Sequence, residues 1–195
     1  MRRAALAILI LCLGWMQPAG AADIDVDRPL LLVATPELYD PLYGAAVLVV
    51  TPIGGDEHVG FIVNRPTGTR LENLFPEHAP SRKVVDPIYL GGPVEPGVIF
   101  ALVQRKTSPG GHSIEMAPGI YAAYEGAVVE GLIKSDPQRA RFMAGLVAWR
   151  AGELREEIQR GAWYVLEPDA ALVMRKPEGL WEELVRRSQR ARNSI

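Results

Sequence analysis

The chain alternates between short apolar runs of strand length and stretches rich in glycine, proline and charged residues. Residues 30–34 and 45–50 are continuous apolar runs, which are typical of strands covered on both faces. Residues 59–63 follow a turn-rich stretch at 52–57, so the pattern predicts an antiparallel hairpin between 45–50 and 59–63. Further strands are predicted at residues 88–90, 98–103, 112–116, 120–123, 163–165 and 171–174.

Helical spacing of apolar positions is found between these runs and at the end of the chain. The spacing predicts helices at residues 127–133 and 152–160, a last helix that begins near Leu180, and short helical turns at 37–43 and 71–75. Residues 141–149 fit neither the helical nor the strand period. Because the helices are interspersed irregularly among the strands, the pattern favours an α+β fold in a single domain.

The N-terminus has the layout of a secretory signal peptide. A basic start is followed by an apolar run from residue 4 to 15 and by small residues, so we expect residues 1–22 to be removed after Ala21 or Ala22. The run is shorter than the roughly 20 residues of a membrane-spanning helix. We therefore expect a periplasmic or secreted protein with no stable membrane span, and an uncleaved N-terminal anchor is the alternative.

Removal of this segment would change what the chain can do chemically. Cys12 is the only cysteine, so the mature chain would have no internal disulfide and no catalytic or metal-binding thiol. The formal net charge would fall from −2 to −4, because Arg2 and Arg3 are removed with it. A mildly acidic chain is a poor binder of phosphate backbones, so we do not expect a nucleic acid as partner.

Four segments, taken together in this order, resemble one protein family. They are residues 31–36 with Asp40-Pro41, residues 60–66 (GFIVNRP), residues 89–94 (YLGGPV), and residues 145–154 followed by Glu157-Ile158 and Trp163. In their order and spacing they resemble the AlgH/YqgE family of bacterial proteins over nearly all of the chain after residue 22. Members usually have glutamine where Glu153 stands and glycine where Ala148 and Arg150 stand.

The resemblance implies a fold but no reaction. It implies a mixed, partly barrel-like β-sheet flanked by helices, in a single domain that spans residues 23–195. The family takes its name from a genetic link to the regulation of alginate synthesis, and no enzymatic reaction is established for it as a class. Typical members resemble cytoplasmic proteins, so export of this chain would separate it from cytoplasmic roles.

Asn64 and Arg65 stand at the end of an apolar strand, directly before Pro66. As a binding site, the asparagine offers one donor and one acceptor group, and the arginine offers a five-donor fork suited to a carboxylate or phosphate. The alternative is architectural: Asn64 binds backbone in the turn, and Arg65 pairs with an internal carboxylate. Pro66 favours an extended backbone at Arg65 in either case.

Gly91, Gly92 and Pro93 follow the strand predicted at residues 88–90. The two glycines allow a close approach to another backbone, or consecutive N–H groups that hold an anion. The alternative is a tight strand exit that requires positive φ. With Asn64 and Arg65, these three residues form the candidate ligand-binding site.

No motif points to a metal, a cofactor or a catalytic group. His58, His78 and His112 show no metal-ligand spacing, and the chain contains no phosphate-binding loop, dinucleotide fingerprint or nucleophile elbow. We therefore expect a non-enzymatic accessory or regulatory protein that binds a partner protein or a small anionic ligand. The alternatives are a cytoplasmic transcriptional regulator, or an unrecognised enzyme with an anion site at Arg65 and His58 or His112 as base.

Overall fold

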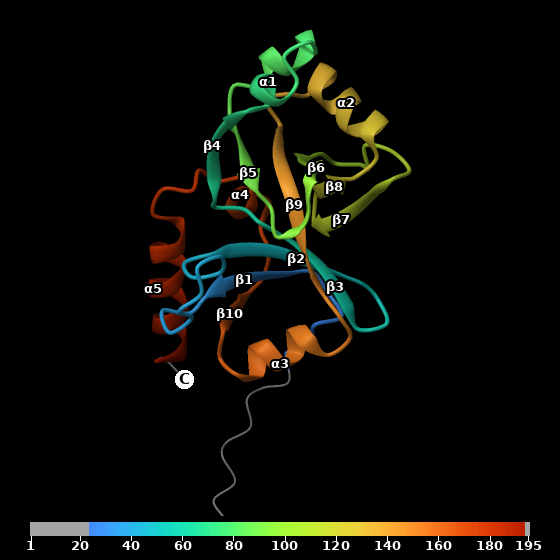
Figure 1. Ribbon diagram of the computed structural model, residues 1–195. Coiled ribbons are helices and arrows are strands. Elements are labelled where there is room, and N and C mark those ends of the chain that lie inside the picture. Colours follow the sequence, from blue (N-terminus) through green and yellow to red (C-terminus); the bar gives the residue numbers. More distant parts are fainter. Residues whose placement is uncertain (1–23, 194–195) are drawn as a thin grey trace, which may run out of the picture.

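One long strand, β9 (Ala140–Trp149), joins the two halves of the fold in the computed structural model, which describes residues 24–193 (Figure 1). The predicted signal peptide, residues 1–22, lies outside the described residues. Among the described residues the sheet has the order β10-β1-β2-β3-β9-β6-β8-β7, and β5 pairs with both β9 and β4. These strands are β1 (Leu30–Ala34), β2 (Val47–Gly54), β3 (Glu57–Ile62), β4 (Pro66–Arg70), β5 (Pro87–Leu90), β6 (Val94–Gln104), β7 (Ser113–Ala117), β8 (Ile120–Ala123) and β10 (Trp163–Leu166).

The sheet is mixed, because β5 runs parallel to β9 while the other pairs are antiparallel. It curls into a half-barrel with helices around it, which confirms the expected α+β fold (Figure 1). The helices are α1 (Leu71–Leu74), the 3₁₀ helix η1 (Ala79–Lys83), α2 (Gly126–Ser135), α3 (Glu153–Gln159), α4 (Ala170–Val173) and α5 (Leu180–Arg192). In Figure 1, α1 and α2 lie at one end of the molecule and α3 at the other, while α5 lies beside β1 and β10.

Burial on both faces explains the continuous apolar runs of the sequence. In β1, Leu31 and Val33 pack into one core cluster, whereas Leu30 and Leu32 pack into another on the opposite face. All five residues of β1 are buried, as predicted for a strand covered on both sides. A third cluster lies beneath α1 and α2 and includes Phe142.

The strand β9 fits no single period because its alternation shifts at Gly145. Before Gly145, the even-numbered residues Phe142 and Ala144 pack into the third cluster. After it, the odd-numbered residues Val147 and Trp149 pack into the cluster that contains Leu30 and Leu32. Gly145 has φ +70°, and opposite it the register of β6 shifts between Val94 and Ile99. A bulge of this kind inserts extra residues into one strand and moves the following side chains to the other face.

The residues predicted at 171–174 as a strand form the helix α4 instead, so that prediction is wrong. Asp169 Oδ1 accepts hydrogen bonds from the backbone N–H groups of Ala171 (2.7 Å) and Leu172 (3.2 Å), which caps and starts a helix. Residues 37–43 form turns and no helix. The sequence did not predict the edge strand β4, because Pro66–Arg70 contains no large apolar residue and three of its five residues are exposed.

Two glycines allow the chain after β5 to cross β9 at close range. A Cβ atom added to Gly92 would lie 2.2 Å from the carbonyl carbon and oxygen of Leu146, and one added to Gly91 would lie 2.1 Å from the Gly145 oxygen. The Gly91 N–H donates to the Ala144 carbonyl (2.8 Å), and its carbonyl accepts from the Ile62 N–H (2.9 Å). Of the roles considered for the glycine pair, this is the close backbone approach. The alternative, a strand exit that requires positive φ, is wrong, because neither Gly91 nor Gly92 has a positive φ.

We predict that Gly92→Ala lowers the free energy of unfolding by about 3 kcal/mol, because the new methyl group meets backbone that cannot move aside alone. The matched control is Gly68→Ala, where an added Cβ meets nothing within 4 Å. Urea unfolding at equilibrium measures both changes, and we expect Gly68→Ala to stay within about 0.5 kcal/mol of wild type. Equal midpoints for the two variants would contradict the close crossing.

Candidate functional site

Asn64 completes the ladder between the ends of β2 and β3. Its Oδ1 accepts a hydrogen bond from the Val47 N–H (2.9 Å), and its Nδ2 donates to the Ala45 carbonyl (2.9 Å). The side-chain amide thus replaces a backbone peptide group at a point where Ala45 has φ +59° and the regular ladder stops. Both polar functions of the side chain have partners within the chain.

Arg65 holds the same loop through two more carbonyls. Its Nη2 donates to Gly44 O (2.5 Å) and its Nη1 to Pro41 O (3.3 Å). No carboxylate takes part in these contacts, so the internal partner is backbone and not the acid that the architectural alternative proposed. The guanidinium is only partly buried, and part of its donor fork remains available at the surface.

The structure brings the two signature segments together through their backbones. The Leu90 N–H donates to the Arg65 carbonyl (2.8 Å), which places Arg65 beside the start of the Gly91-Gly92-Pro93 segment. The glycines are buried and Pro93 is exposed. The N–H of Gly91 is already bonded to β9, so it does not contribute to an anion site. Ligand binding by Asn64, Arg65, Gly91, Gly92 and Pro93 stays a prediction.

Arg141, which the sequence did not single out, lies next to this motif and is only 7% exposed. Its Nη1 donates to the carbonyls of Val63 and Val173, both at 2.8 Å. Its Nη2 donates to the carbonyls of Met174 (3.1 Å) and Arg175 (2.8 Å). The only signal in the sequence is one arginine at the second position of an apolar strand.

The Arg141 cation also lies over an aromatic ring. Its Cζ is 4.3 Å from the ring centroid of Tyr89 in β5. Burial lowers the pKa of the Arg141 guanidinium, and the charges of Tyr89 and Asp86 act in the opposite direction. Arginine stays protonated in proteins, so four carbonyl dipoles and one ring face compensate a buried positive charge.

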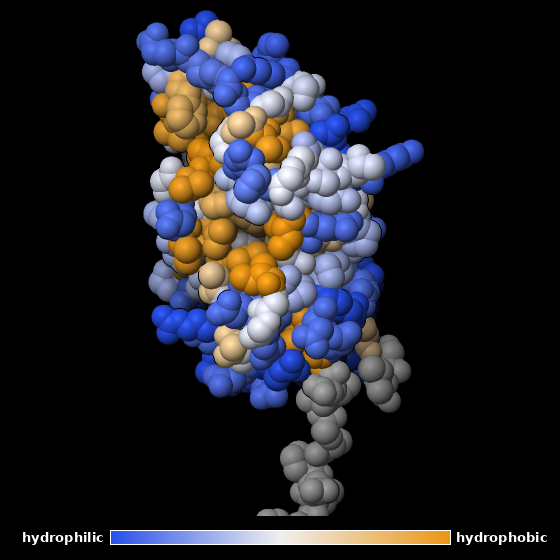
Figure 2. Space-filling model, turned by 90° about the vertical axis from the view of Figure 1, so that its right-hand side faces the viewer, coloured by the Kyte–Doolittle hydropathy of each residue, from blue (hydrophilic) through white to orange (hydrophobic). Residues whose placement is uncertain are grey.

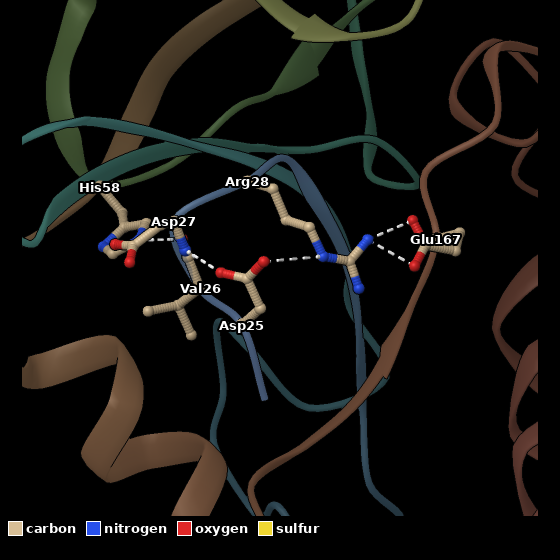
Figure 3. A network of polar contacts seen from close by, with 6 residues as sticks. All are labelled: Asp25, Val26, Asp27, Arg28, His58 and Glu167. Atoms are coloured by element: carbon tan, nitrogen blue, oxygen red, sulfur yellow. Dashed lines mark hydrogen bonds and ion pairs between the residues drawn. The ribbon is translucent and has the colours of Figure 1, made fainter. Parts of the chain in front are cut away.

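The three histidines hold separate positions, and none of their polar contacts involves Arg65. His58 is 1% exposed, and its Nε2 donates to the Val26 carbonyl (2.8 Å), while its Nδ1 has no partner (Figure 3). His78 Nδ1 lies 2.7 Å from Ser81 Oγ, and His112 Nε2 lies 3.8 Å from a Glu125 oxygen. Within residues 24–193, no group of three or more His, Cys, Asp or Glu side chains could hold a metal ion.

The start of the described chain is anchored at two points, both visible in Figure 3. Val26 is held by His58 of β3, and Arg28 pairs with Glu167 just after β10 and with Asp25 (3.6 Å). The ion pairs are largely exposed, so each contributes little stability. Together they hold residues 25–28, directly before β1, against β3 and the end of β10.

A groove between α1, α2 and β6 is lined mainly by apolar side chains. It encloses about 370 Å³. Its lining consists of Leu71, Phe75, His78, Ile99, Gly126, Val129, Glu130 and Ile133. Phe75, which lines the groove, and its neighbour Leu74 are 44% and 48% exposed, which is high for large apolar side chains.

The apolar surface continues from this groove along β6. The bulge of β6 leaves Val94 and Val98 exposed, and Val94 lines a second hollow with Ile53 at the tip of the β2–β3 hairpin. We call the six residues Ile53, Leu74, Phe75, Val94, Val98 and Ile99 the apolar stripe. Figure 2 shows apolar side chains gathered in a band on the side of the molecule that carries α2 and this hairpin.

Comparison with known proteins gives one consistent result. The family model described as DUF179, AlgH-like, matches residues 31–192. A UPF0301 protein of Streptomyces avermitilis is 30% identical over 179 residues, covering 88% of this chain and 91% of the relative. A UPF0301 protein of Streptomyces coelicolor is 31% identical over 179 residues, with the same coverage of each chain.

Two solved structures share the fold. The solution structure of AlgH from Pseudomonas aeruginosa matches with a TM-score of 0.69 at 22% identity, over 87% of this chain and 92% of that one. A crystal structure from Corynebacterium diphtheriae matches with a TM-score of 0.68 at 20% identity, over 83% and 86%. At these identities the likeness concerns the fold alone.

We predict that Arg65→Ala lowers the free energy of unfolding of the ligand-free protein by about 1–2 kcal/mol, because two loop carbonyls lose a charged donor. Asn64→Ala should cost about as much or more, since it leaves both a donor and an acceptor of the backbone unpaired. The control is Arg70→Ala, whose ion pair with Glu72 (3.5 Å) is exposed and should contribute close to nothing.

Chemical unfolding of the three variants measures these changes. An Arg65→Ala protein as stable as wild type would contradict the loop-holding role and would leave Arg65 available for a ligand.

Proposed function

The chain belongs to the AlgH-like family. We propose that it is an exported, non-enzymatic accessory protein that binds a partner protein through the apolar stripe. The relatives named above carry only a family designation, so their names add no substrate or partner. The proposal therefore rests on this chain's own surface.

The observation that carries the proposal is the clustering of exposed apolar side chains around the α1–α2 groove. Single exposed apolar residues are common on soluble proteins, but contiguous patches mark interaction sites. Here Phe75, which directly follows α1, lines the groove with Val129 of α2 and Ile99 of β6. Val98 and Val94 of β6 are exposed as well. Three separate elements thus contribute to one face.

The shape and rim of the groove indicate what kind of partner fits. A volume of about 370 Å³ suits one or two large apolar side chains and lies near the lower limit for small-molecule pockets. Polar groups border it: His78 lies 3.9 Å from Glu130, which also pairs with Lys134. An apolar centre with a charged rim is the usual arrangement at protein interfaces. We therefore expect a partner segment with apolar anchors and polar flanks.

The bulge in β6 supports the same assignment. Residues between Val94 and Ile99 leave the ladder with β9, and Glu95 has φ +52°, a conformation rare for residues other than glycine. Bulges are frequent next to functional sites because they redirect side chains. In this chain the bulge places Val94 and Val98 at the surface.

The positions of the histidines favour binding over catalysis. An enzyme using Arg65 as its anion holder would need a base nearby, but the polar contacts of His58 and His112 are with Val26 and Glu125. The proposed export rests on the N-terminal sequence pattern. Among residues 24–193, no helix is long and apolar enough to span a membrane.

We predict that photo-crosslinking amino acids placed at Phe75 and at Val98 capture the same protein partner in the native cells. Phe75→Glu should abolish the crosslink formed from position 98, because a charge in the groove costs about 2 kcal/mol or more at an interface centre. Mass spectrometry of the crosslinked bands identifies the partner. The control position is Tyr39, which is 94% exposed but lies outside the stripe.

The proposal fails if positions 75 and 98 give no crosslink, or if position 39 captures the same protein equally well. It also fails if Phe75→Glu leaves the crosslink from position 98 unchanged while circular dichroism shows that the variant is folded.

We further predict that cell fractionation recovers the protein outside the cytoplasm, with a mature N-terminus at Ala22 or Asp23. N-terminal sequencing of the purified protein measures this directly. Intact Met1 in the cytoplasmic fraction would contradict export and would favour a cytoplasmic regulator.

A further inference from the structure

A second hollow, chemically unlike the apolar groove, lies where β6 ends, beside the β7–β8 turn and the start of β9. It encloses about 470 Å³. Its lining consists of Gln104, Arg105, Lys106, Pro118, Gly119, Arg139 and Ala170. Three of these seven side chains are cationic, and none is acidic. We call Arg105, Lys106 and Arg139 the basic pocket.

Backbone hydrogen bonds fix the segments that carry the three cations. The Arg105 N–H donates to the Gly119 carbonyl (2.9 Å), and the Gln104 N–H donates to the Arg139 carbonyl (3.3 Å). Gln104 also pairs with Ile120 in the β6–β8 ladder. The backbone is thus held at Arg105 and Arg139, each one residue beyond a strand, and Lys106 follows Arg105 directly.

Two of the three cations have no internal charge partner. Arg105 Nη1 lies 3.9 Å from Asp136 Oδ2, at the outer limit of an ion pair. In the part of the chain that the structure describes, the side chains of Lys106 and Arg139 form neither a hydrogen bond nor an ion pair. Two further acids adjoin the lining: Glu115, whose Oε1 accepts from the Gly119 N–H (3.2 Å), and Asp169, which precedes Ala170.

The basic pocket is positively charged, whereas the chain as a whole has a negative net charge. The chain carries a formal net charge of −2, so unspecific anion attraction is weak over most of its surface. In contrast, the basic pocket gathers three cationic residues around one hollow. A cluster of three cations with two left unpaired is therefore a feature that a bound anion would explain.

We propose that the basic pocket binds a small molecule through a phosphate monoester group. A phosphate monoester carries about −1.5 to −2 charges at neutral pH and three acceptor oxygens, which matches two arginine forks and one lysine better than a single carboxylate does. The arginines bind two oxygens each in a planar fork, and the lysine adds a point charge. The volume leaves room for the remainder of a small metabolite.

This site is distinct from the predicted anion site at Asn64 and Arg65. Those side chains are bonded to the loop between β1 and β2, whereas Lys106 and Arg139 lie beyond the ends of β6 and β9. It is also independent of the apolar stripe, because the two pockets share no lining residue. A failure of one proposal leaves the other in place.

The test is to titrate the mature protein separately with inorganic phosphate, glycerol 3-phosphate and acetate. NMR spectra recorded during each titration, at constant ionic strength, measure the shifts of the backbone amide signals. We expect saturable shifts of the Gly119 and Arg139 amides with both phosphates and none with acetate. Lys106→Ala and Arg139→Ala should each weaken binding about tenfold, the effect of removing one charge-assisted contact. The control is Arg187→Ala on α5, which removes one charge outside the pocket and should leave the affinity unchanged.

Three results would overturn the proposal. They are shifts that do not saturate with either phosphate, acetate binding as tight as phosphate, and an equal loss of affinity in the α5 control. Because Lys106 and Arg139 are exposed and hold no internal contact through their side chains, we expect both variants to fold with unchanged stability.

Discussion

The buried guanidinium of Arg141 is the interaction on which the arrangement of this fold depends. From the start of β9 it donates to the carbonyl directly after β3 and to three successive carbonyls, the last of α4 and the two that follow it. It also lies over the Tyr89 ring of β5. These segments lie 32 to 78 residues from Arg141 in sequence. A buried cation without a carboxylate is expensive unless many dipoles compensate it. The four carbonyls provide that compensation only when all the segments are in place, so the contact selects one arrangement of the chain.

The residues of the two signature segments, GFIVNRP and YLGGPV, also hold backbone segments together. Asn64 and Arg65 bond the carbonyls and the N–H of the loop before β2, and Gly91 and Gly92 let the chain cross β9 at backbone distance. The polar side chains Asn64 and Arg65, which belong to the segments that resemble the family, thus bond backbone groups within the fold. Within residues 24–193, the apolar stripe is exposed, and the side chains of Lys106 and Arg139 in the basic pocket form no hydrogen bond or ion pair. This division explains why the sequence indicates the family so clearly while it indicates chemistry so poorly.

The strands and helices with a clean period were predictable, and the exceptions have physical causes. Residues 30–34 and 120–123 form strands within the predicted bounds, and the helix predicted at 152–160 is α3. The strand β9 was ambiguous because the bulge at Gly145 shifts its alternation, which no fixed period describes. The helix α4 was mistaken for a strand because its four apolar residues are too few to show a helical period, although Asp169 stands at the capping position.

The candidate sites were harder to predict, since each depends on residues far apart in sequence. The partners of Arg141 and the lining of both pockets come together only through the sheet topology. The central claim, that Arg141 holds the fold together, is tested most directly by the free energy of unfolding of Arg141→Met in urea. We expect a loss of about 3–5 kcal/mol, the range found when a buried charged partner is removed and the groups around it stay unpaired. A variant within about 0.5 kcal/mol of wild type would contradict the account, because the carbonyls of residues 63 and 173–175 would then need no cation.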